Sequence, residues 1–149
     1  MKRYLLLTAL VLATTAQADF WDNCTAYAGT IITANSYGND KGGLCNDPND
    51  TNLTNNCNGK RFCMSGNKMN WWSAFTWCNE IDGTLVSFSN LCPGTQTINS
   101  GTCANIKEIT QKVWTSTAWA QNKVIAMWSN GKVGDNYRDH TDFSALCEE

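Results

Sequence analysis

An aromatic-rich run near the middle of the chain has the pattern of a helix: Met69-Asn70-Trp71-Trp72-Ser73-Ala74-Phe75-Thr76-Trp77-Cys78. Apolar residues within it and just beyond recur at spacings of three and four, the stripe that an amphipathic helix buries: Trp71, Ala74, Cys78 and Ile81. Asn70 can cap the start of this helix and Gly83 its end. The apolar residues 85–88 then predict a strand.

The segments after this helix predict one more helix and several strands. Residues 103–113 carry apolar side chains at helical spacing, whereas residues 113–116 and 123–128 have strand composition. Asn130-Gly131 favours a tight hairpin turn, after which residues 133–138 would return and residues 143–147 would close the sheet. The predicted class is therefore α+β, with two short helices and a small antiparallel sheet.

The segment before the helix is dominated by polar residues. Between Asp19 and Asn58 the only convincing apolar run covers residues 26–32 and predicts one strand, with loop around it. Residues 46–52 offer many side-chain oxygens, which are the ligands that calcium prefers. They lack the residue order of a calcium loop, and Asx-rich segments commonly hydrogen-bond their own backbone, so we expect a turn here.

The first 18 residues have the features of a signal peptide. Lys2 and Arg3 precede the apolar stretch 4–12, and Ala16-Gln17-Ala18 supplies the small residues of a cleavage site. This stretch is about half as long as a membrane-spanning helix, so a retained anchor is disfavoured. We expect residues 19–149 to form a single domain that is secreted, periplasmic or at the cell surface, with an Asn/Asp/Gly-rich N-terminal extension (19–62).

Eight cysteines follow the expected cleavage point and predict a disulfide framework. There is no Cys-x-x-Cys motif and only one histidine, His140, so the ligand spacing of a zinc site is missing. We expect no metal and no cofactor.

The mature part would carry nine basic and thirteen acidic residues, with no basic cluster beyond Lys60-Arg61. Nucleic acids and anionic membranes are bound through concentrated basic surfaces. We therefore expect no nucleic acid partner and no membrane insertion after signal cleavage.

Together these motifs resemble the C-type lectin-like family. Its first helix carries an aromatic residue, an alanine and then Trp-Cys, followed by glycine and an apolar strand, as residues 70–88 do here. Val113-Trp114-Thr115-Ser116 matches the family's central tryptophan-containing strand, and Ala145-Leu146-Cys147 matches its usual ending. With Phe62-Cys63 and Leu91-Cys92-Pro93-Gly94, the combination is most similar to bacterial exported or pilin-associated members.

The resemblance implies part of the disulfide framework. In the family the helix cysteine bonds to the terminal one, which implies a bridge between Cys78 and Cys147. Cys92 and Cys103 enclose a turn-rich loop that a second bridge would close. Cys63 stands where the family's longer members have an extra pair, and the resemblance implies Cys57 or Cys45 as its partner. The cysteines left to pair among themselves are Cys24, Cys45, Cys57 and Cys63.

The chain lacks the triplets with which the family's lectins bind calcium and sugar. Neither Glu-Pro-Asn nor Gln-Pro-Asp occurs, and the usual Trp-Asn-Asp is only partly matched by Trp128-Ser129-Asn130. Because the missing carboxylates neutralise the ion, calcium-dependent sugar binding is disfavoured.

Seven tryptophans suggest stacking on the apolar face of a sugar, although a small domain needs most of them in its core. We expect Trp71 and Trp114 to be buried, and one of Trp72, Trp119 and Trp128 to be exposed. The residues predicted to contact a ligand lie in the C-terminal part of the chain: Trp119, Trp128, Asn130, Asp135, Asn136, Tyr137 and Arg138.

Enzymatic activity is not expected. His140 has Asp139 and Asp142 nearby, but no serine occupies a recognisable nucleophile turn. We therefore expect an exported, disulfide-stabilised binding module that recognises a surface protein or glycan without calcium. The alternative is a structural subunit of an envelope or pilus-like assembly. A concave polar and aromatic site would favour ligand recognition, and a large apolar patch would favour assembly.

Overall fold

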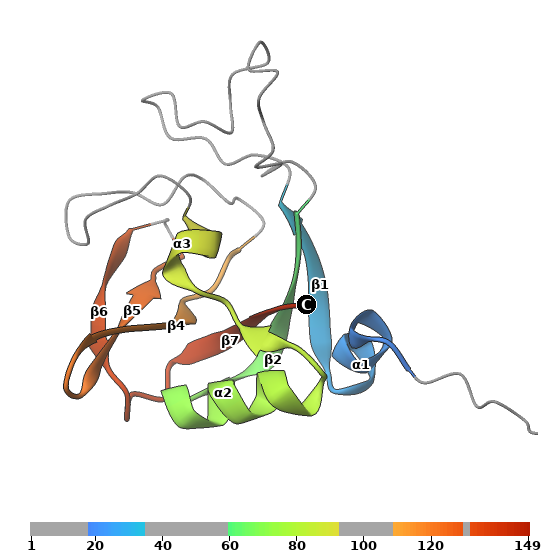
Figure 1. Ribbon diagram of the computed structural model, residues 1–149, viewed down its shortest axis with the longest axis horizontal. Coiled ribbons are helices and arrows are strands. Elements are labelled where there is room, and N and C mark those ends of the chain that lie inside the picture. Colours follow the sequence, from blue (N-terminus) through green and yellow to red (C-terminus); the bar gives the residue numbers. More distant parts are fainter. Residues whose placement is uncertain (1–17, 35–59, 93–108, 130–131) are drawn as a thin grey trace, which may run out of the picture.

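The computed structural model describes residues 18–34, 60–92, 109–129 and 132–149. In this part of the chain, one seven-stranded sheet is flanked by three helices (Figure 1). The helices are α1 (Phe20–Ala26), α2 (Trp71–Glu80) and α3 (Phe88–Leu91). The strands are β1 (Gly29–Ala34), β2 (Lys60–Met69), β3 (Thr84–Leu85), β4 (Val113–Ala120), β5 (Lys123–Met127), β6 (Val133–Tyr137) and β7 (Phe143–Glu148).

The last strand lies in the middle of the sheet. The strand order is β1-β2-β7-β4-β5-β6, and the short β3 also pairs with β7. β7 runs antiparallel to β2 and β3 but parallel to β4. The predicted α+β class is confirmed, but the sheet is mixed and larger than the small antiparallel sheet expected from the sequence. β2 and β1 enlarge it on one side, and β7 enters between β2 and β4.

α2 forms where the sequence predicts it. Asn70 Oδ1 accepts a hydrogen bond from Ser73 N at 2.9 Å and so caps the first turn. Three members of the predicted stripe are fully buried against the sheet: Ala74, Cys78 and Ile81. Trp71 is only partly buried, although its indole Nε1 donates a hydrogen bond to Thr115 O at 2.9 Å.

The end of α2 differs in detail from the prediction. The residue with a positive φ is Asp82 (64°), one position before the expected Gly83. Gly83 N donates a hydrogen bond to Cys78 O at 2.9 Å. Gly83 is needed here because it has no side chain, which allows neighbouring elements to pack closely. A Cβ at Gly83 would collide with the Phe20 ring and lie 2.9 Å from Glu148 O. This glycine therefore lets α1 and β7 approach the end of α2.

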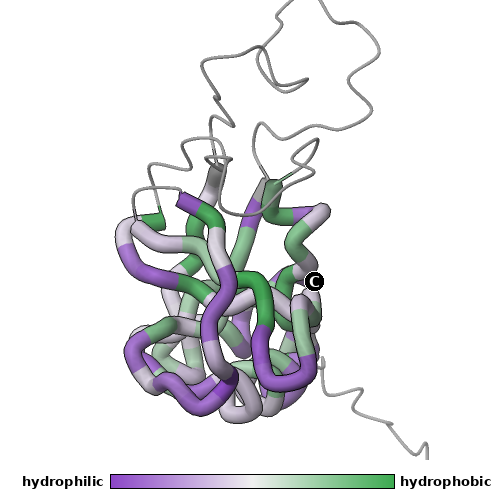
Figure 2. Tube along the Cα trace, turned by 90° about the vertical axis from the view of Figure 1, so that its left-hand side faces the viewer, coloured by the Kyte–Doolittle hydropathy of each residue, from purple (hydrophilic) through white to green (hydrophobic). Residues whose placement is uncertain are grey.

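Two hydrophobic cores fill opposite faces of the sheet. Successive residues of a strand point to opposite faces, and Val113 and Trp114 of β4 belong to different cores. The first core includes Leu91 of α3. The second lies against α1 and α2, where the fully buried Trp114 ring stacks on Phe143 with 4.3 Å between centroids. In Figure 2, hydrophobic and hydrophilic residues are mixed along the trace of the described residues.

Two disulfides fasten both helices of the second core to the middle of the sheet. Cys78 of α2 is joined to Cys147 of β7 across 5.5 Å between Cα atoms, the pairing that the family resemblance implies. Cys63 of β2 is joined to Cys24 of α1, a pairing within the set of four cysteines left to pair among themselves. Neither Cys57 nor Cys45, the partners suggested for Cys63, is correct. Cys63 and Cys147 are directly opposite each other on β2 and β7, so the two bridges are neighbours.

Cys92 is also disulfide-bonded. Its partner lies outside the described residues, as does Cys103, so the expected pairing of Cys92 with Cys103 stays a prediction. Disulfides form and persist in oxidising compartments. The bridges therefore indicate an oxidising, extracytoplasmic location. Among the described residues, no helix is long and apolar enough to cross a bilayer.

The remaining elements agree with the sequence in part. The strands predicted at 113–116, 123–128, 133–138 and 143–147 are confirmed as β4 to β7. The strand expected at 85–88 is wrong beyond Leu85, because Ser87 Oγ accepts from Asn90 N and caps α3. The strand expected at 26–32 begins only at Gly29, after α1.

Several predictions fall outside the described residues. They are the signal peptide apart from Ala18, the turn at 46–52, the helix at 103–113 before Ile109, and the turn at Asn130-Gly131. The described residues 109–112 are not helical.

Candidate functional site

The residues predicted to contact a ligand do not form one pocket. Asn130 lies outside the described residues. Trp128 is partly buried and meets the Phe143 ring edge-on, with 5.5 Å between centroids, so it packs against the second core. Asn136 is also partly buried, and its Oδ1 accepts a hydrogen bond from Tyr137 N at 2.9 Å.

Asp135 and Tyr137 are engaged by a lysine of the neighbouring strand. Lys123 Nζ lies 2.7 Å from Asp135 Oδ2 and 4.7 Å from the centre of the Tyr137 ring. The hydrogen bond to the Asp135 carboxylate raises the pKa of Lys123 above its ordinary value. Tyr137 nevertheless remains 51% exposed.

Arg138 belongs to a different group of side chains, because it lies toward α2. Its guanidinium sits 4.7 Å from the centre of the Trp71 ring, a cation–π contact. Arg138 Nε is buried and has no hydrogen-bond partner within the described part of the chain. The indole face beneath the guanidinium is a weak acceptor that compensates this N–H in part.

Aromatic side chains on the outer side of α2 are the main feature that the sequence prediction underrated. Trp72 is 52% exposed and Phe75 is 43% exposed. The Trp71 ring lies between them, with 6.2 Å to Trp72 and 5.6 Å to Phe75 between centroids. Both exposed residues fall off the buried stripe of the helix, where a solvent-facing helix usually carries charged or polar residues. Aromatic residues at these solvent-facing helix positions were the sequence signal for this surface.

Backbone hydrogen bonds bring three segments together at this end of the molecule. Trp71 N donates to Arg138 O at 3.0 Å, and Arg138 N donates to Asn122 O at 3.1 Å. The start of α2, the turn after β4 and the turn after β6 therefore meet, at the lower left of Figure 1. Four exposed aromatic side chains lie on the elements that meet here, α2, β4 and β6, and we call them the aromatic end: Trp72, Phe75, Trp119 and Tyr137.

The aromatic end concentrates most of the exposed large apolar side chains of the described residues. Trp119 is 53% exposed, so two of the three tryptophans considered for exposure, Trp72 and Trp119, reach solvent. Only two further large side chains of this kind are exposed in the described ranges, Tyr27 and Ile31 near β1. An exposed apolar group of this kind is typical of an interaction surface.

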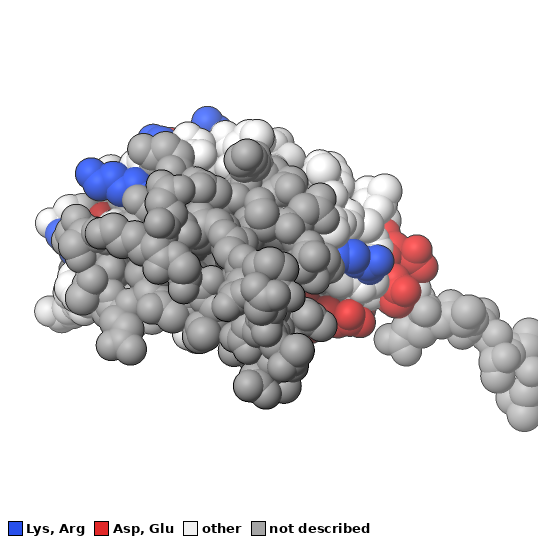
Figure 3. All heavy atoms as spheres, turned by 90° about the horizontal axis from the view of Figure 1, so that it is seen from above, with Lys and Arg blue, Asp and Glu red and all other residues white. Residues whose placement is uncertain are grey.

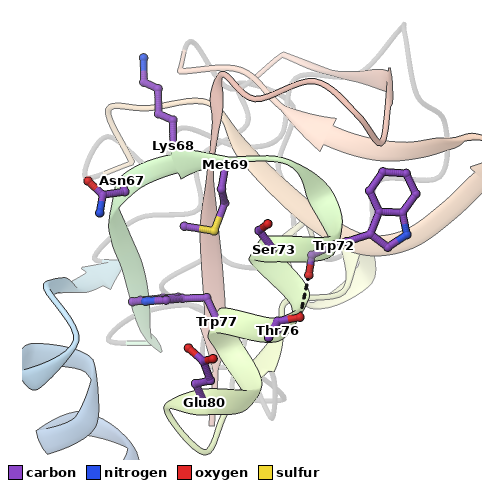
Figure 4. A pocket seen from close by; sticks show the side chains of 8 residues that line it. All are labelled: Asn67, Lys68, Met69, Trp72, Ser73, Thr76, Trp77 and Glu80. Carbon is purple, nitrogen blue, oxygen red and sulfur yellow. Dashed lines mark hydrogen bonds between the residues drawn. The ribbon is translucent and has the colours of Figure 1, made fainter.

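A groove of about 490 Å³ lies between α2 and the end of β2. Its lining residues are Asn67, Lys68, Met69, Trp72, Ser73, Thr76, Trp77 and Glu80. In Figure 4 the Met69 side chain reaches down beside the Trp77 ring, while the Trp72 indole points away from the groove. Thr76 Oγ1 donates to Trp72 O at 3.0 Å, as the dashed line shows. The volume falls within the range of small-ligand sites.

Charged side chains do not form one large patch on the described part of the face drawn in Figure 3. On the face drawn in Figure 3, Lys and Arg form separate small groups instead of a continuous patch. In the described ranges, no three His, Cys, Asp or Glu side chains gather as metal ligands would. His140 is exposed and its ring stacks on Tyr137 at 6.3 Å. Asp142 instead binds Lys112 Nζ at 2.6 Å, which lowers the pKa of Asp142.

The resemblance to C-type lectin-like domains implies a bridge between the first long helix and the last strand. Cys78 and Cys147 form that bridge, and Trp114 occupies the centre of the second core. No protein-family model matches this sequence, and a comparison with curated proteins finds no significant match.

Proposed function

We propose that this protein is a C-type lectin-like binding module that is exported to the periplasm, the cell surface or the medium and docks on a surface protein without calcium. The observation that carries this proposal is the aromatic end. Its four aromatic side chains stand on elements that the disulfides and the sheet hold in place, so little ordering is needed on binding.

The composition of the aromatic end favours a protein partner. Tryptophan, tyrosine and arginine dominate the hot spots of protein interfaces. Trp72 and Tyr137 supply large exposed rings. Arg138, in the turn after β6, adds a guanidinium that stacks over the Trp71 ring. A glycan that stacks on Trp72 or Trp119 is the competing ligand, and the experiment below separates the two.

The polar groups at this end support recognition without a metal ion. Asp135 is already engaged by Lys123, so its carboxylate is neutralised locally. Calcium is held by several oxygen ligands, usually including carboxylates that offset its charge. A ligand at the aromatic end would instead bind by ring contacts and hydrogen bonds.

Arrays of glycans and of surface proteins, probed with the purified oxidised chain, test the proposal. We expect binding to one or a few proteins that survives a calcium chelator and is lost in Trp72→Ala/Trp119→Ala. Tyr27→Ala is the matched control, because Tyr27 is equally exposed (50%) but lies beside β1. Binding to glycans alone would replace the proposed partner class. Unchanged binding by the double variant would refute the site.

A structural role in an envelope or pilus-like assembly is the second candidate. It is favoured by Ile31, which is 40% exposed on β1 at one margin of the sheet order, where another chain could pair. Light scattering over a concentration series separates the candidates. Self-association that Ile31→Thr abolishes would support assembly, and a monomer at all concentrations would exclude it.

A further inference from the structure

The groove between α2 and β2 places a flat aromatic ring beside a carboxylate. Trp77 is partly buried and packs against the second core, and this packing holds its ring in place. Figure 4 shows Met69 on one side of the Trp77 ring and Glu80 on the other. An indole face next to a carboxylate matches an alkylammonium or guanidinium group, because the ring quadrupole and the negative charge both attract a cation.

The position of Glu80 strengthens this preference. Glu80 is the last residue of α2, where the helix dipole presents its negative end, and the last turn holds no basic residue. In the described part of the chain, Glu80 forms no ion pair and no hydrogen bond through its side chain. A carboxylate at this end of a helix is unfavourable by itself, and a bound cation would relieve both the carboxylate and the dipole.

The other polar groups of the groove suit a peptide. Lys68, its one basic lining residue, extends away from Glu80 in Figure 4 and does not cover the Trp77 ring. Asn67 and Ser73 line the same groove and can hydrogen-bond to peptide groups. The chain is also acidic overall, with a formal net charge of -2 at pH 7, which favours encounter with a basic partner.

We propose that this groove binds a Lys or Arg side chain from a basic segment of a partner protein. The alkyl stem lies along the Trp77 ring and the cationic head pairs with the Glu80 carboxylate. The groove shares Trp72 with the aromatic end, but the two groups that would hold the cation, Trp77 and Glu80, do not belong to that end. The inference therefore does not rest on the function proposed above.

Titration of the full oxidised chain with capped tri-lysine and tri-arginine peptides tests this site. Shifts of the Trp77 indole N–H signal, assigned with Trp77→Phe, report on binding, and capped tri-glutamate is the negative probe. We expect saturable binding of both basic peptides that weakens with added salt, because the contact is electrostatic.

Glu80→Gln keeps the shape of the side chain and removes its charge. We expect it to weaken tri-lysine binding about two- to fivefold, the effect of losing one exposed ion pair. Asp139→Asn is the matched control, since Asp139 is an exposed carboxylate on the turn after β6, and it should bind like the wild type.

Three results would overturn the inference. They are equal binding by Glu80→Gln, equal binding of tri-glutamate, and no shift of the Trp77 signal at millimolar peptide. Trp119→Ala removes an exposed ring of the aromatic end that does not line the groove, so it should still bind tri-lysine. Loss of the aromatic end and loss of the groove therefore give different outcomes.

Discussion

Removing the bridge between α2 and β7 tests whether it holds the two ends of the fold together. The perturbation is Cys78→Ala/Cys147→Ala, which leaves no unpaired thiol at either position. The two cysteines are 69 residues apart in sequence. For a loop of that length, the chain-entropy relation gives about 4 kcal/mol of stabilisation at 25 °C.

Burial adds a second contribution to this loss. Both cysteines are fully buried, so each missing sulfur leaves a small cavity. A cavity of about one methylene costs roughly 0.5–1.5 kcal/mol. We therefore expect a total destabilisation of about 5–7 kcal/mol, which is comparable with the whole net stability of many small domains.

Urea unfolding followed by tryptophan fluorescence measures this loss. The midpoint should fall while the slope with denaturant rises or stays equal, because the unfolded chain becomes less constrained. A variant that is already unfolded without urea is the extreme form of the same result. Cys24→Ala/Cys63→Ala provides a comparison. That bridge spans 39 residues, so its removal should lower the free energy of unfolding by a similar amount.

A stability within about 1 kcal/mol of the wild type would refute the reasoning, because neither the loop term nor the cavity term could then operate. The bridge would then join two segments that the rest of the fold already holds together. In that case the interlocking of β7 between β2 and β4 would hold the two ends together by itself.

Three further outcomes follow from the structure. Gly83→Ala should cost about 1–3 kcal/mol in urea unfolding, because the new Cβ meets the buried Phe20 ring and Glu148 O; an unchanged midpoint would show that α1 can shift away. The hydrogen bond from Lys112 lowers the pKa of Asp142, so this contact stabilises the fold above the ordinary carboxylate pKa and is lost as the pH falls through the lowered value. Asp142→Asn should therefore flatten the acid side of a melting-temperature profile, and an equal slope would contradict it. Calcium at millimolar concentration should leave the melting temperature unchanged, and a clear rise would reveal a calcium site.

The C-terminal strands and α2 could be predicted because their signals are local. β5 and β7 are apolar runs of ordinary strand length, and α2 shows its buried stripe at helical spacing. α1 has only seven residues, too few for a period to appear. Its signals were the cap, where Asp19 Oδ1 accepts from Asp22 N at 2.8 Å, and the buried pair Phe20 and Cys24.

β2 could not be predicted because it breaks the usual alternation. Residues 62–65 are buried without interruption, since the strand is covered on both faces. Ser65 is among them because its hydroxyl accepts from Ala145 N and donates to Asn67 O, which bridges the irregular register between β2 and β7. Because Ser65 is polar but buried, a search for hydrophobic residues along the sequence does not identify β2 as a central strand.

The candidate site was only partly predictable for a related reason. Tyr137 and Arg138 are adjacent in sequence, but Tyr137 ends β6 and Arg138 begins the turn after it, so one side chain meets Lys123 and the other Trp71. The groove forms where α2 follows the end of β2, and its shape depends on the angle at which the chain turns at Asn70. Composition can therefore suggest which residues reach solvent, but long-range pairing decides which of them meet.

The division of α2 into two sides explains how one helix can serve both stability and recognition. Its inner side is fixed by Ala74, Cys78 and Ile81, which are fully buried, and by the covalent link to β7. Because the helix is held from within, its outer side is free to carry Trp72 and Phe75, residues that would be a solubility liability without a partner. Exposed aromatic residues on so firmly held an element are better explained by recognition than by folding, since the core is complete without them.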